Sequence, residues 1–289
     1  FFDLRLEKPE HFNQALLLQT REPVQIEALR CAVRHLVAHH DALRLRFVRE
    51  GGMTRQTSVG TDDTATVQAL DLSTLPQLQQ AAAITAAAAE AQASMNLEQG
   101  PLMRVLWIDL GAHQRGRLLW VIHHLAVDGV SWRILLEDLE TAYGQACAGA
   151  PLRLPAKTTS YQKWVEHLLR HAQSESVSRE RPYWRSLPST MSLPCDHADG
   201  DNTVQSARIL AVDLDEAETR LLMHGLPSLY DADVSDALLT AVLSAVLPWV
   251  GTRRLRIDLE HHGRHELAPG LDLSRTVGWF TALYPAVLE

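Results

Sequence analysis

The chain has 289 residues, of which 46% are hydrophobic and 21% charged, and its formal net charge is −8. This balance is typical of a globular protein with one large domain or two smaller ones, and it excludes general disorder. The acidity argues against DNA or an anionic membrane as the main partner, because both require a basic face, and no apolar run approaches the roughly 20 residues of a membrane span.

Strand-like runs alternate with helical stretches along the first half, which indicates an α/β or α+β class. Two apolar runs, 102–110 and 118–122, flank a glycine-containing connection and predict buried strands joined by a hairpin or loop. The spacing of apolar residues before them predicts a strand over 12–18, a helix over 24–40, a strand over 43–48 and an alanine-rich helix over 81–93.

After these strands a helix should begin near Gly129, with Asp128 or Ser131 as its N-terminal cap. Residues 171–206 are polar, contain prolines and have weak periodicity, which predicts a linker or crossing segment. Beyond that segment we expect a strand over 208–214, helices over 217–223 and 235–247, and strands over 255–260 and 280–288.

The cysteines and the first residues suggest the setting of the chain. Cys31, Cys147 and Cys195 stand far apart without a C-x-x-C pair, so we expect reduced thiols in a cytoplasm and neither a disulfide framework nor a zinc site. The chain begins at Phe1 rather than Met and lacks the pattern of a signal peptide, so we expect a piece of a longer protein.

The stretch most informative about chemistry is 121–132, VIHHLAVDGVSW. A buried strand runs directly into His123 and His124, and side chains alternate faces along a strand, so one imidazole should face a cavity and the other the interior. A neutral imidazole at a cleft can act as a general base near pH 7. Asp128 could orient His124 or pair with an arginine, and Gly129 should allow a backbone geometry closed to other residues.

The full pattern H-H-x-x-x-D-G, after an apolar strand and before a helix, resembles the condensation and epimerization domains of nonribosomal peptide synthetases. Further segments resemble family motifs, namely RHLVAHHDALRLRF over 34–47, LEQGPLMRV over 97–105 and Tyr183-Trp184. The resemblance implies an α/β (α+β) fold of two chloramphenicol-acetyltransferase-like subdomains in a V shape around a central cleft. Residues 1–170 would form the N-terminal subdomain with the His motif, 171–206 the crossing segment, and 207–289 the start of a truncated second subdomain.

Two later segments favour epimerization over condensation within this family. DLEHHGRHE over 258–266 resembles the epimerization signature E-G-H-G-R-E, and TVGWFTALYP over 276–285 resembles the V-G-W-F-T signature. Condensation domains share the His motif but not usually the other two together. Within E-G-H-G-R one residue departs from the pattern, because His261 stands where the signature has its first glycine, while Glu260, His262, Gly263 and Arg264 match.

The resemblance implies that His124 and Glu260 are the catalytic pair. Epimerization removes the Cα proton of a thioester-bound residue and returns one on the opposite face, which is most simply served by two groups across a cleft. Which of them removes the proton, and whether His124 mainly stabilises the enolate, stays open. The expected supporting residues are His123, Asp128 and Gly129, and possible pocket residues are Ser131, His262, Arg264 and Trp279.

The substrate is expected on the phosphopantetheine arm of a peptidyl carrier protein, upstream on the same polypeptide and beside neighbouring synthetase modules. No cofactor bound by the chain itself is expected. A metal is not expected either, since His35 and His39 lack an H-E-x-x-H pattern and a third ligand. The alternatives are a condensation enzyme and, because of His261, an inactive carrier-docking module of the same fold.

Overall fold

The computed structural model describes residues 1–4, 6–61, 67–188, 193–197, 199–200, 203–265 and 270–289. The chain divides into two compact units, one of Phe1–Val177 with His261–Ala282 and the other of Ser178–Glu260 with Leu283–Glu289. The segment 261–282 therefore groups with the front of the chain, although it is consecutive in sequence with the second unit.

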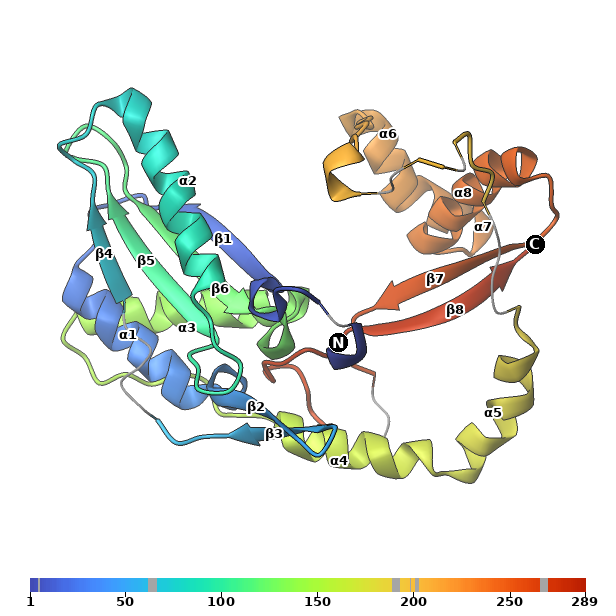
Figure 1. Cartoon of the computed structure of the whole chain (residues 1–289), viewed down its shortest axis with the longest axis horizontal. Coiled ribbons are helices and arrows are strands. Elements are labelled where there is room, and N and C mark those ends of the chain that lie inside the picture. Colours follow the sequence, from blue (N-terminus) through green and yellow to red (C-terminus); the bar gives the residue numbers. More distant parts are fainter. Residues whose placement is uncertain (5, 62–66, 189–192, 198, 201–202, 266–269) are drawn as a thin grey trace. The chain divides into compact units, whose positions relative to one another are not determined.

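A four-stranded sheet in the order β1-β6-β5-β4 forms the centre of the first unit (Figure 1). Its strands are β1 (Asn13–Gln19), β4 (Val67–Asp71), β5 (Met103–Asp109) and β6 (Arg117–His123). Strand β6 is antiparallel to both β1 and β5, whereas β4 is parallel to β5. The register pairs Asn13 with His123 and Gln14 with Ile122, which puts the start of β1 beside the end of β6.

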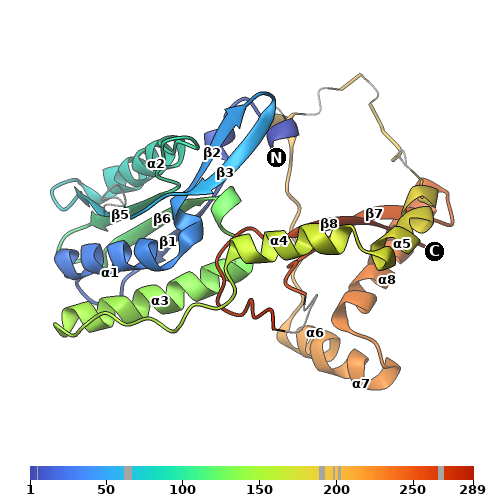
Figure 2. The same ribbon diagram turned by 90° about the horizontal axis from the view of Figure 1, so that it is seen from below.

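Helices cover both faces of this sheet, as Figure 2 shows. Helices α1 (Ile26–His39) and α3 (Gly129–Cys147) lie on one face, and α2 (Gln77–Ala93) lies on the other. Successive buried residues of β6 alternate between the two cores, since Trp120 packs with the α1 and α3 side and Val121 with the α2 side. An apolar residue is therefore required at nearly every position of β6, which is why the sequence shows a continuous run there.

The remaining elements are shorter or lie in the second unit. A hairpin of β2 (Leu45–Glu50) and β3 (Met53–Ser58) is antiparallel, and β7 (Leu255–His261) and β8 (Ala282–Leu288) form a two-stranded sheet. The other helical segments are α4 (Tyr161–Ala172), α5 (Glu175–Ser186), α6 (Glu216–Arg220), a π-helical turn (Leu221–Gly225), α7 (Leu226–Tyr230) and α8 (Val234–Val250).

Most predicted elements are confirmed, but one prediction is wrong. The expected strand over 208–214 is not a strand, and its apolar residues Ile209 and Val212 are exposed. The segment 171–206 contains helix α5 with Pro182 inside it, and its role as a linker or crossing segment stays a prediction. Within that segment residues 189–192, 198 and 201–202 lie outside the described residues.

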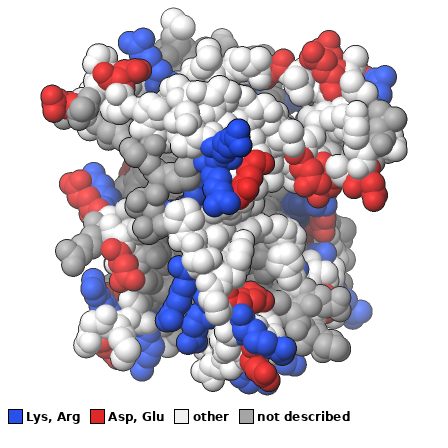
Figure 3. Space-filling view, turned by 90° about the vertical axis from the view of Figure 1, so that its right-hand side faces the viewer, with Lys and Arg blue, Asp and Glu red and all other residues white. Residues whose placement is uncertain are grey.

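No helix in the described ranges combines the length and the apolar character needed to cross a membrane. On the face shown in Figure 3, basic and acidic side chains of the described residues are mixed.

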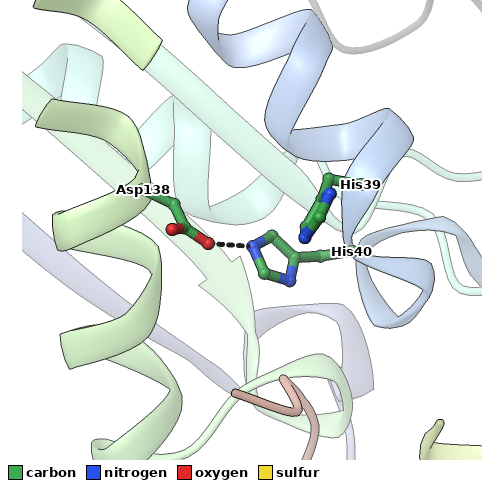
Figure 4. Close-up of side chains that lie close together, drawn as sticks. All are labelled: His39, His40 and Asp138. Carbon is green, nitrogen blue, oxygen red and sulfur yellow. Dashed lines mark hydrogen bonds and ion pairs between the residues drawn. The ribbon is translucent and has the colours of Figure 1, made fainter. Parts of the chain in front are cut away.

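A largely buried polar network joins the end of α1 to α3 and to the segment 271–281. Figure 4 shows the part of it formed by His40 and Asp138. Asp138 is 1% exposed, and its two oxygens accept hydrogen bonds from His40, at 2.9 Å, and from Arg275. Burial alone would raise the pKa of Asp138, but His40 and then Arg275 lower it below its ordinary value.

The same carboxylate, together with His39 and His40, forms a group of potential metal ligands among the described residues. Both oxygens of Asp138 are already engaged, and Lys157 and Arg275 line the adjoining cavity of about 50 Å³. Two cations beside the cluster disfavour a bound metal ion, so we assign the cluster as a structural ion-pair network.

We expect Asp138→Asn to lower the free energy of unfolding by about 2–3 kcal/mol, because His40 and Arg275 lose a charged acceptor where water is excluded. Urea denaturation at pH 7 measures this loss. The control is Glu137→Gln, which removes a carboxylate that pairs with the same Arg275 but is 61% exposed. That variant should lose less than about 1 kcal/mol, and equal losses would contradict a special role for Asp138.

Candidate functional site

Strand β6 ends at His123, and a 3₁₀ turn (His124–Ala126) separates it from α3. His123 is fully buried. Its Nδ1 accepts a hydrogen bond from the Leu125 backbone N–H at 3.2 Å, and its Nε2 donates to the Pro9 carbonyl at 2.9 Å. Burial lowers the pKa of His123, so its imidazole is neutral at pH 7. His123 is thus held inside the fold as a structural residue.

His124 is half-buried and makes different bonds. Its Nδ1 donates to the Val127 carbonyl at 2.9 Å, and because a carbonyl only accepts, the proton of the neutral ring lies on Nδ1 and the lone pair on Nε2. The rings of Phe12 and Trp279 lie at centroid distances of 5.1 and 4.9 Å, with Phe12 stacked at 15°. The imidazole therefore has a fixed orientation and a basic nitrogen of known identity.

Asp128 caps α3 and is engaged by groups other than His124. Its Oδ1 accepts from the Ser131 backbone N–H at 2.7 Å, and its Oδ2 accepts from the Phe280 backbone N–H at 3.1 Å. Arg264 approaches Oδ1 to 3.1 Å, with both side chains nearly buried at 3% and 7% exposure. Of the two roles that the sequence left open for Asp128, the structure has the pairing with an arginine.

Arg264 extends this network into the segment 271–281. Its guanidinium also donates to the carbonyls of Leu273 and Thr276 and lies 3.9 Å from the centre of the Phe280 ring. Burial lowers the pKa of Arg264, while the charge of Asp128 acts in the opposite direction.

Ser131 completes the connection between α3 and the segment 271–281. Its hydroxyl donates to the Gly278 carbonyl and accepts from the Gly278 backbone N–H and from Arg264. Ser131 is fully buried, so it acts here as a packing and hydrogen-bonding residue. Trp279 follows Gly278 in the chain, so these bonds place its ring beside that of His124.

The two glycines of the motifs differ in what they require. Gly263 has a φ of +66°, and a Cβ there would overlap the Phe280 carbonyl, so a side chain is excluded both by conformation and by space. Gly129 is the first residue of α3, has no positive φ and would meet nothing within 4 Å. The expected special backbone geometry at Gly129 is therefore wrong.

Three histidines gather at the end of β7 and after it. The rings of His261 and His262 have centroids 3.9 Å apart, and His265 stacks on His261 at 4.3 Å and 15°. His262 is exposed, but the neighbouring atoms remove part of its solvation, which lowers its pKa, and the imidazoles of His261 and His265 lower it further. The imidazole at position 261, where the signature has glycine, is thus accommodated by stacking on other imidazoles.

Glu260 is an exposed residue near the end of β7 and belongs to the second compact unit. Arg256 and Asp258, at alternate positions of the same strand, form an ion pair at 3.1 Å. The pairing of Glu260 with His124 stays a prediction from the motifs. Glu266, the last residue of the signature segment, lies outside the described residues.

The sequence did not reveal that Gln14 lies beside His124 and is itself held by Trp132. Gln14 of β1 donates from Nε2 to His124 Nε2 at 3.1 Å, and its Oε1 accepts from Trp132 Nε1 at 2.8 Å. Trp132 ends the motif stretch and could have been suspected from that position. Gln14 is 110 positions away from His124, and only the pairing of β1 with β6 brings it to the site.

The whole chain is similar in sequence to known proteins. A model of the condensation-domain family matches residues 1–289. A linear gramicidin synthase chain of Brevibacillus parabrevis is 47% identical over 292 residues, and chondramide synthase cmdD of Chondromyces crocatus is 46% identical over 294 residues. All of this chain is covered in both cases, but it spans only 6% and 8% of those proteins.

Two solved structures illustrate the likeness in fold. The epimerization domain from the third module of tyrocidine synthetase B matches with a TM-score of 0.90 and 35% identity, over 100% of this chain and 64% of that one. The first condensation domain of the calcium-dependent antibiotic synthetase matches with a TM-score of 0.73 and 18% identity, over 99% and 65%. The expected mixed α/β fold of condensation and epimerization domains is confirmed.

We expect Arg264→Met to lower the free energy of unfolding by about 3–5 kcal/mol, because Asp128 would keep a buried charge without its partner. Chemical denaturation measures the loss. Arg254→Met is the control, since the pair of Arg254 with Glu289 is solvent-exposed and should be worth less than about 1 kcal/mol. A loss at Arg264 no larger than at Arg254 would refute the structural role of the buried pair.

The lowered pKa of His123 predicts a pH dependence of stability. As pH falls, the unfolded chain takes up a proton at this imidazole before the folded chain does. The stability that the neutral His123 contributes is therefore complete above pH 6.5 and is lost as pH falls below that value. Stability measured between pH 7 and 5 should therefore fall less steeply in His123→Asn than in the wild type, by up to about 1.4 kcal/mol per pH unit. Parallel slopes in the two proteins would show that His123 protonates equally in both states.

Proposed function

Since this chain belongs to the condensation-domain family, we propose that it epimerizes the Cα of an aminoacyl or peptidyl thioester, from L to D, in nonribosomal peptide synthesis. The observation that supports epimerization rather than condensation is the contrast in sequence identity. The chain is 35% identical to a solved epimerization domain and 18% identical to a solved condensation domain, although both share its fold.

The proposed reaction exchanges one C–H bond for another. A base takes the Cα proton, the electron pair of that bond moves into the thioester as an enolate, and a proton is delivered to the opposite face of the carbon. Nothing is consumed, so two groups that can each hold a proton are sufficient for the proton transfers themselves. The chemistry also requires stabilisation of the enolate oxygen, which is commonly the largest single contribution to such catalysis.

His124 has the properties that one of these groups needs. Its Nδ1 proton is held by the Val127 carbonyl, so the lone pair lies on Nε2, which can take a proton once the Gln14 amide that donates to it moves away. Contacts with Phe12 and Trp279 hold the ring without a carboxylate partner in the described residues. We assign the second group to Glu260 on the strength of the E-x-H-G-R motif, and the order in which the two act is left to experiment.

The proposal includes the way in which substrate arrives. A peptidyl carrier protein, upstream on the same polypeptide, would present the thioester on its phosphopantetheine arm, and that arm belongs to the carrier. The gramicidin and chondramide synthases are matched by this chain over less than a tenth of their length. The carrier and the neighbouring modules would therefore lie in such a longer protein.

His261 bears on whether the site is active. An imidazole in place of the signature glycine could have displaced Glu260, but the ring stacks on His265 and packs beside His262 instead of standing alone. This arrangement supports an active epimerase over a docking module that has lost turnover.

The test uses the full-length protein with its carrier loaded with an L-aminoacyl group, in deuterated buffer. We expect deuterium at Cα and formation of the D-residue, measured by mass spectrometry and chiral chromatography after release of the thioester. His124→Ala and Glu260→Gln should each slow the exchange by about 100-fold or more, because each removes a group that transfers a proton.

Exposed residues of the same types provide the controls for this test. His113→Ala and Glu98→Gln remove an imidazole and a carboxylate from the surface and should leave the exchange rate within about twofold of wild type. Peptide-bond formation without Cα exchange would assign condensation instead. Carrier binding without exchange, unchanged by His124→Ala, would assign a docking module.

A further inference from the structure

A relay of two hydrogen bonds reaches the basic nitrogen of His124 from the interior of the first unit. Trp132 Nε1 donates to Gln14 Oε1 at 2.8 Å, and Gln14 Nε2 lies 3.1 Å from His124 Nε2. The three residues come from α3, from β1 and from the 3₁₀ turn between β6 and α3. Neither Gln14 nor Trp132 has a charge, so the relay can act only through the direction of its bonds.

The chemistry of the groups fixes that direction. An indole N–H is a donor only, so the oxygen of the Gln14 amide must face Trp132. The amide nitrogen, also a donor, then faces His124 and requires an acceptor there. Nδ1 of His124 donates to the Val127 carbonyl, so Nε2 is the acceptor that faces the Gln14 amide nitrogen in the resting state.

We infer that Gln14 and Trp132 are positioning residues that keep Nε2 of His124 free of its proton between turnovers, an inference that rests on the proposed function. When Nε2 takes a proton, two donors face each other across 3.1 Å, which is unfavourable. Gln14 can relieve this only by turning its amide and giving up the bond from Trp132. The relay therefore favours the return of the proton from His124.

Packing keeps the relay from relaxing easily. Trp132 is 7% exposed, and its ring meets the fully buried Trp120 edge-to-face, with centroids 5.3 Å apart. Gln14 is held in β1 opposite Ile122. Charged and titratable groups in the described residues near the turn include Glu10 and His124 beside His123, and the buried pair of Asp128 and Arg264. The variants below leave all of them in place.

The test compares Gln14→Glu, Gln14→Met and Trp132→Phe in the full-length protein. The first readout does not depend on catalysis: it is the pH at which hydrogen exchange at C2 of the His124 ring reaches its midpoint, measured by mass spectrometry. Gln14→Glu offers a carboxylate to the protonated ring, so the midpoint should move upward by about one pH unit or more. Gln14→Met removes the donor and should move it upward by less, and Trp132→Phe, which frees the amide to turn, should move it in the same direction.

The second readout is the pH profile of Cα deuterium exchange. In Gln14→Glu the low-pH limb of kcat should shift upward by the same amount. A shift of one pH unit gives about a fivefold loss of kcat at the pH of the wild-type midpoint, with recovery at higher pH and KM changed less than twofold. Gln19→Glu and Gln19→Met, at the exposed far end of β1, are matched controls that should change neither readout.

The outcomes separate this inference from the proposed function. If wild type catalyses Cα exchange but the Gln14 variants leave the C2 midpoint and the pH profile unchanged, the relay is refuted and the epimerase stands. Loss of activity at every pH without a change in the C2 midpoint would reduce Gln14 to a structural residue and also refute the relay. If wild type shows no Cα exchange, the proposed function fails, and a shifted C2 midpoint would still establish the relay.

Discussion

The buried ion pair between Asp128 and Arg264 is the interaction on which the site depends. It joins the start of α3 to a residue 136 positions later in the chain, and both side chains are almost inaccessible to water. Two such charges are stable in the interior only together, because each alone would lack the solvation that water supplied. The segment 271–281 is held by this pair, and with it the ring of Trp279 beside His124.

The division of labour within the His motif follows from this arrangement. Asp128 is committed to Arg264, Ser131 and Phe280, so the orientation of His124 is left to neutral groups, namely the Val127 carbonyl and Gln14. A carboxylate against His124 would favour its protonated form, whereas a carbonyl and an amide fix the ring without doing so. The buried charges of Asp128 and Arg264 thus stabilise the fold, and in the described part of the chain the hydrogen bonds of the His124 ring go to uncharged partners.

Periodicity in the sequence predicted the parts of the fold whose burial is local. The continuous apolar run of β6, the helical spacing of α1 and the Asp128 cap are each set by neighbours in the chain, so they could be recognised there. The alternating residues 208–214 have the period of a strand but form none, since a strand also requires a partner that periodicity does not supply. Gln14 escaped prediction for the same reason, because its role arises only from the register of β1 against β6.

The close approach of Gly263 to the Phe280 carbonyl has a consequence for recombining such domains. Phe280 donates its backbone N–H to Asp128, and the Arg264 guanidinium packs on its ring. The same residue therefore contacts Gly263 through its carbonyl and both members of the ion pair. A chimera that imports the H-G-R tripeptide without the segment that carries Phe280 would contain the arginine but not the ring on which its guanidinium packs. Crossover points for transplanting these segments therefore belong outside both of them, so that the H-G-R tripeptide and the segment with Phe280 always come from the same parent domain.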